Sequence, residues 1–66
     1  MTGVELKLER IRALSGALVE LMEPTEQTSG RDRDLYGLAA MVYDHAIAGL
    51  DEVRAEALDQ EAKAHD

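Results

Sequence analysis

The sequence contains no cysteine, tryptophan or phenylalanine, and its only proline is Pro24. Without cysteine it forms neither a disulfide framework nor a thiolate zinc site, which are the usual reinforcements of small domains. A domain of 66 residues gains only a few kcal/mol of net stability from one hydrophobic core. Association with another chain is the remaining route to a stable fold.

Long apolar runs are also missing. No uncharged run approaches the roughly 20 residues that cross a bilayer, and residues 1–7 lack the basic-then-apolar order of a signal peptide. We therefore expect a cytoplasmic protein that does not enter the membrane.

Positive charge is scarce. The chain has 14 acidic and 7 basic residues, a formal net charge of −7, and such a chain repels phosphate backbones and anionic lipid. The sequence thus predicts no direct nucleic-acid binding. The simplest interpretation of the acidity is a solvated surface, and the sharper one is a surface that imitates nucleic acid.

Apolar residues recur at intervals of three and four in two segments, which is the period of an α-helix. Pro24 cannot continue a helix, the residues after it are polar, and Ser29 or Asp32 can cap the next helix. We predict a helix at about 4–23, a loop at 24–32, a helix at about 33–63 and a frayed tail to residue 66. The fold class is all-α: residues 1–66 form a single antiparallel two-helix hairpin.

Small side chains at Ser15, Gly16 and Ala17 predict a close approach of the two helices. Opposite charges also favour the antiparallel orientation, although exposed ion pairs contribute only about 0–1 kcal/mol each. The expected pairs join Lys7, Arg10 and Arg12 to Glu52, Glu56 and Asp59, and Glu20 and Glu23 to Arg31 and Arg33.

The segment 35–43 contains nine consecutive uncharged residues. In a helix its apolar groups cover the whole circumference, so this helix needs more than one neighbour. Because the chain supplies only one other helix, we predict a homodimer in the form of a four-helix bundle. The predicted interface comprises Leu35, Tyr36, Leu38, Ala39, Val42, Tyr43, Ala46, Ile47 and Leu50.

No motif for catalysis, cofactor binding or metal binding is recognised. His45 follows Asp44 directly, so on a helix the two side chains point about 100° apart, and Val42 stands where a di-iron motif needs glutamate. A single Gly30 does not make a phosphate-binding loop. We predict no catalytic, cofactor or metal residues.

Residues 8–22, Leu-Glu-Arg-Ile-Arg-Ala-Leu-Ser-Gly-Ala-Leu-Val-Glu-Leu-Met, resemble the opening helix of helical chorismate mutases. That family uses a third helix and further cationic side chains, which this chain lacks, so the resemblance does not extend to activity. In length, acidity and helix–loop–helix pattern the chain is similar to the small plasmid copy-number regulators, which implies a dimeric four-helix bundle.

The sequence therefore predicts a small acidic homo-oligomeric module for protein–protein interaction or regulation, without catalytic activity. Its partners are a second copy of itself and, in a regulatory role, another protein. One alternative is an acidic inhibitor, encoded by a phage or plasmid, that mimics nucleic acid and binds a basic target protein. A second is a ligand-binding or enzymatic bundle built across the dimer around Tyr36, Tyr43 and His45.

Overall fold

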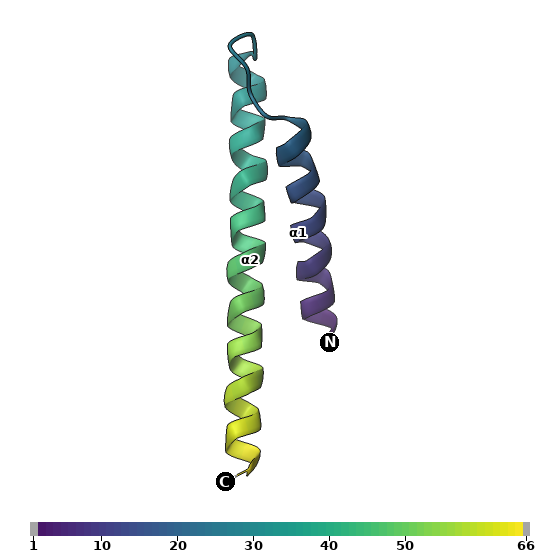
Figure 1. The fold of residues 1–66 in the computed structure, drawn as a ribbon, viewed down its shortest axis with the longest axis vertical. Coiled ribbons are helices and arrows are strands. Elements are labelled where there is room, and N and C mark those ends of the chain that lie inside the picture. Colours follow the sequence, from purple (N-terminus) through teal and green to yellow (C-terminus); the bar gives the residue numbers. More distant parts are fainter. Residues whose placement is uncertain (1, 66) are drawn as a thin grey trace.

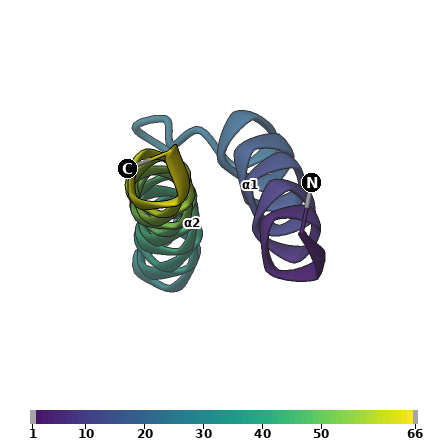
Figure 2. The ribbon, with the colours of Figure 1, turned by 90° about the horizontal axis from the view of Figure 1, so that it is seen from below.

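The computed structural model describes residues 2–65, and for residue 65 the backbone only. It contains two helices, α1 (Gly3–Leu21) and α2 (Gly30–His65), joined by one loop. The helices run antiparallel and side by side, and neither has a second neighbour (Figures 1 and 2). The predicted all-helical hairpin is confirmed.

The boundaries of α1 follow from its caps. The Thr2 hydroxyl accepts a hydrogen bond from the Glu5 N–H at 3.1 Å, which is the usual N-cap contact. At the other end the Met22 N–H donates to the Leu18 carbonyl at 2.9 Å, two residues before Pro24. The helix therefore ends at Leu21, two residues earlier than predicted.

Helix α2 begins three residues earlier than predicted, because Ser29 and not Asp32 is its cap. The Ser29 hydroxyl accepts from the Asp32 N–H at 3.2 Å, and the Ser29 carbonyl accepts from the Arg33 N–H at 3.0 Å. At its other end α2 continues to His65, past the predicted end at residue 63. The prediction of a frayed tail also covers residue 66, which lies outside the described residues.

The loop is closed by its own polar groups. The Thr28 hydroxyl accepts from the Thr25 N–H at 2.7 Å. The Arg33 guanidinium donates to the Thr25 carbonyl at 2.6 Å and to the Thr28 carbonyl at 3.4 Å. Arg33 thus ties the loop to the first turn of α2, rather than forming the predicted ion pair with Glu20 or Glu23.

Each helix contacts the other through one stripe of residues spaced three and four apart. The most deeply buried residues of the contact are mostly small: Ser15 is only 3 % exposed and donates its hydroxyl to the Ile11 carbonyl at 2.6 Å. A Cβ atom added to Gly16 would lie 3.2 Å from the Tyr43 ring. The predicted small-residue approach therefore includes Ser15 and Gly16, whereas Ala17 is exposed. The contact stripes, buried or half-buried, are Leu8, Arg12, Ser15 and Val19 on α1 with Met22 directly after it, and Tyr36, Ala39, Tyr43, Ala46, Leu50 and Val53 on α2.

The core inside the hairpin is thin. Its buried apolar residues in the described chain are Ala39, Ala46 and Leu50, and none of the larger side chains there is fully enclosed. The molecule measures 59 × 14 × 13 Å, with a radius of gyration of 16.2 Å. A compact chain of this length has a radius of gyration of about 11 Å. The hairpin is therefore a rod that leaves most of its side chains at the surface.

Helix α2 extends well past the N-terminus of α1 (Figure 1). Every side chain from Arg54 to Ala64 is exposed. Neither helix in the described part of the chain is long and apolar enough to span a membrane.

Candidate interaction surface

Helix α1 carries a second apolar stripe, which is exposed beside the contact with α2. The exposed fractions are 41 % for Ile11, 69 % for Leu14, 48 % for Leu18 and 84 % for Leu21. Each of these residues directly precedes a residue of the α1 contact stripe. One residue turns a helix by about 100°, so this second stripe lies beside the contact and not opposite it.

Helix α2 repeats the same arrangement. Leu35, Leu38 and Val42 are 42 %, 58 % and 47 % exposed, and each directly precedes a residue of the α2 contact stripe. His45 continues this second stripe, directly before Ala46.

The two exposed stripes lie on the same side of the hairpin. Two antiparallel helices are related by a two-fold rotation about the line perpendicular to the plane that contains their axes. This rotation keeps each side of that plane in place. Residues that stand one position before the contact stripe in each helix therefore lie on the same side of the hairpin. Together the stripes form one continuous surface across both helices, which we call the apolar face. It comprises Ile11, Leu14, Leu18, Leu21, Leu35, Leu38 and Val42.

The structure divides the predicted interface residues into two groups. Leu35, Leu38 and Val42 are exposed on the apolar face. The other six are buried or half-buried in or beside the helix contact: Tyr36, Ala39, Tyr43, Ala46, Ile47 and Leu50.

The predicted interface contains no residue of α1, so the α1 half of the apolar face comes from the structure alone. The signal that could have found it is a pair of three-and-four stripes offset by one residue. That signal was hidden because the contact stripe includes polar Arg12 and Ser15, whereas the exposed stripe holds leucines.

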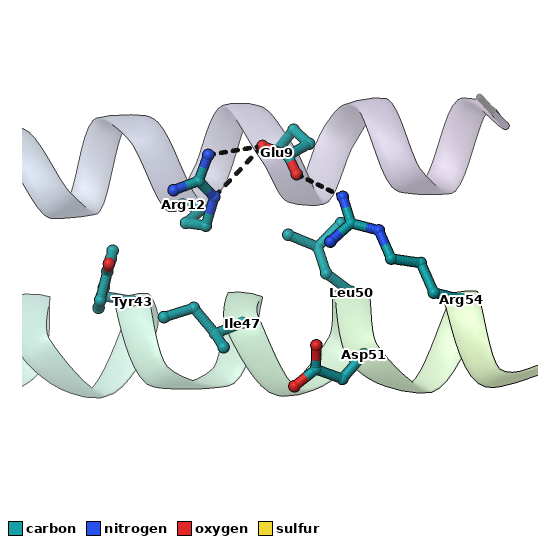
Figure 3. Close-up of a pocket in the computed structure, with 7 residues that line it drawn as sticks. All are labelled: Glu9, Arg12, Tyr43, Ile47, Leu50, Asp51 and Arg54. Atoms are coloured by element: carbon teal, nitrogen blue, oxygen red, sulfur yellow. Dashed lines mark hydrogen bonds and ion pairs between the residues drawn. The ribbon is translucent and has the colours of Figure 1, made fainter.

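The opposite side of the hairpin carries an open groove of about 290 Å³. At its edge the Glu9 carboxylate accepts from the Arg12 guanidinium at 2.8 Å and from that of Arg54, on α2, at 2.8 Å (Figure 3). The other residues that line this groove all belong to α2: Tyr43, Ile47, Leu50 and Asp51 (Figure 3).

Electrostatics hold the Glu9 cluster in its charged form. Hydrogen bonds from Arg12 and then from Arg54 lower the pKa of Glu9 below its usual 4.5. The same contact with Glu9 raises the pKa of Arg12. A carboxylate fixed between two guanidinium groups is suited to joining the helices rather than to transferring protons.

The ion pairs differ from those expected. The pair that joins the two helices is Glu9 with Arg54, and Arg12 binds Glu9 on its own helix. The third pair in the described chain, Lys63 with Asp59, lies within α2. Arg12 faces Glu9 because the two stand three residues apart on one helix, where side chains meet readily.

His45 is exposed, on the same side as the apolar face. Among residues 2–65 no group of three or more histidine, cysteine, aspartate or glutamate side chains is placed to hold a metal ion. The apolar face is therefore the feature of this chain that most clearly requires an explanation.

Comparison with known protein families, curated proteins and solved structures finds no match to this chain.

Proposed function

We propose that this chain is an acidic module for protein–protein interaction that associates with itself, as a homodimeric four-helix bundle, and has no catalytic activity. The apolar face carries the proposal. Seven large aliphatic side chains, each at least 41 % exposed, form a single two-helix surface. Contiguous apolar surfaces of this kind mark interaction sites in proteins that do not enter membranes.

The total surface supports the same conclusion. The chain exposes 5343 Å², whereas a compact monomer of 7.2 kDa exposes about 4,100 Å². The excess is about 1,200 Å², and a stable interface buries about 800 Å² per partner. A second hairpin seated on the apolar face thus brings the exposed area close to that of an ordinary folded protein.

The energetics of the isolated hairpin point in the same direction. Ordering one residue costs about 1.5 kcal/mol of conformational entropy, and two alanines and one leucine are too little buried apolar surface to offset that cost. Enclosing the exposed part of the apolar face adds about 1 kcal/mol per side chain. Folding and association are therefore coupled in this proposal.

The test compares two leucine-to-glutamate substitutions that change charge equally. Leu18→Glu places a carboxylate in the middle of the apolar face. Leu58→Glu places one on the part of α2 beyond α1, where Leu58 is 66 % exposed. We expect Leu18→Glu to weaken association more than tenfold in sedimentation equilibrium, and Leu58→Glu to leave it within twofold.

Because folding depends on association, Leu18→Glu is also expected to lose helical circular dichroism on dilution well before the Leu58→Glu control. Equal association of the two variants contradicts the proposal.

A further inference from the structure

The apolar face changes character along its length. A Cβ atom added to Gly16 would meet Tyr43, and one added to Gly49 would lie 3.2 Å from Leu8, which fixes the register of the two helices. Both helices rise about 1.5 Å per residue, so Leu18 lies at about the level of Ala40, and Lys7 at about the level of Asp51.

At the loop end, the two exposed stripes therefore bring only aliphatic side chains together. These are Leu14, Leu18 and Leu21 of α1 with Leu35, Leu38 and Val42 of α2. At the open end the same stripes continue as Lys7 and then exposed Val4 on α1, and as Glu52 and then Glu56 on α2. The loop end is thus wholly aliphatic, whereas the open end carries three charged residues beside Val4.

Two symmetric arrangements let one hairpin cover the apolar face of another. In one, the symmetry axis runs along the helices and both loops lie at the same end. In the other, the axis crosses the helices and the loops lie at opposite ends. The polarity of the face distinguishes these arrangements.

With the loops at opposite ends and the helices fully overlapped, the apolar end of each hairpin meets the charged end of the other. Leu38 then faces the partner's Glu52, and Leu35 faces the partner's Glu56. Burying a carboxylate against leucine without a cationic partner is costly.

With the loops at the same end, each α1 packs against the α2 of the other copy at the same level. Leu18 then meets the partner's Leu38, and Lys7 meets the partner's Glu52. At the loop end apolar groups face apolar groups, and at the open end Lys7 faces a residue of opposite charge. Adjacent helices are antiparallel in both arrangements, as in up-and-down four-helix bundles, so polarity and charge alone distinguish the two.

We propose that two copies of this chain dimerise through the apolar face with both loops at the same end of the bundle. This inference rests on the proposed self-association and specifies its geometry. The occupant of the apolar face is a second copy of this chain, because the face complements itself in both polarity and charge.

The absence of cysteine allows a direct test with single spin labels on the full-length chain. Gln27→Cys labels the loop, Ala62→Cys labels the far end of α2, and Ala48→Cys labels the middle of the hairpin. All three side chains are exposed, so the labels leave the packing intact. Pulsed electron–electron resonance then measures the distance between the two copies.

With the loops together, the distances at positions 27 and 62 are both within the width of a bundle, roughly 20–35 Å for helices about 10 Å across. With the loops apart, both distances exceed roughly 45 Å, given a rise of 1.5 Å per residue from the middle of the hairpin. Position 48 lies near that middle and gives a short distance in either arrangement.

Short distances at all three sites are the expected result. A short distance at position 48 with a long one at position 27 or 62 overturns the shared loop end, but leaves the proposed dimer intact. If none of the three sites gives a measurable distance between two copies, the dimer itself is overturned, and the proposed function with it.

Discussion

At the scale of single residues, Glu9 is the side chain that joins the two helices electrostatically. It accepts from Arg12 on its own helix and from Arg54 on α2, and these two hydrogen bonds lower its pKa. A carboxyl group whose pKa is lower in the folded state stabilises that state above its unfolded pKa. This contribution is lost as the pH falls from about 4.5 through the lower folded-state value.

Glu9→Gln is therefore expected to lower the free energy of unfolding at pH 7 and to have less effect as the pH falls below about 4.5. The effect is modest, since exposed ion pairs are screened by solvent. Urea unfolding of both proteins from pH 7 to pH 3, at equal chain concentration, measures the difference. We predict that this difference in unfolding free energy becomes smaller as the pH falls.

Glu20→Gln is the matched control, since it removes one negative charge from an exposed position of the same helix. A difference for Glu9→Gln that is constant with pH, or equal to that of the control, contradicts the role assigned to Glu9.

At the scale of elements, the start of α2 depends on one hydroxyl group. Ser29 accepts from the Asp32 N–H at 3.2 Å and begins the helix directly after the loop. Ser29→Ala removes that acceptor and is expected to cost about 1 kcal/mol of unfolding free energy. Ser29→Asn keeps an acceptor suited to the same position and is expected to stay close to the native value.

Thermal unfolding at one fixed chain concentration distinguishes the two Ser29 variants. If Ser29→Ala and Ser29→Asn unfold at the same temperature, the cap assigned here is wrong.

The two helices, the loop and their antiparallel order were predictable from the sequence. The reason is physical: three-and-four spacing, Pro24 and the cap residues act locally, within one or two turns. The face that each helix turns toward the other was not predictable, because two adjacent stripes on each helix could form the contact. In α1 the contact stripe contains Arg12 and Ser15, and hydrophobicity alone favours the leucine stripe next to it.

The candidate site was predictable only in part for the same reason. Leu35, Leu38 and Val42 were identified because a long uncharged segment needs two neighbours. Leu14 and Leu18 were not among the predicted interface residues, yet both are exposed on the apolar face. The ion pair of Glu9 with Arg54 was also missed, because long side chains reach beyond their own level on the helix.

At the scale of the whole molecule, the structure is a thin rod with one apolar side. Its radius of gyration is 16.2 Å, against about 11 Å for a compact chain of this length. Placing two such rods face to face produces a four-helix bundle with a continuous core. In the proposed dimer, the second copy thus supplies the core that a single hairpin lacks.

The most direct test of this account is the molar mass of the native chain by sedimentation equilibrium, at micromolar concentration, with circular dichroism of the same sample. We predict a helical species of twice the chain mass of 7.2 kDa, which loses its helicity as dilution separates the two copies. A species that remains helical and has the mass of one chain throughout the dilution series contradicts the central claim.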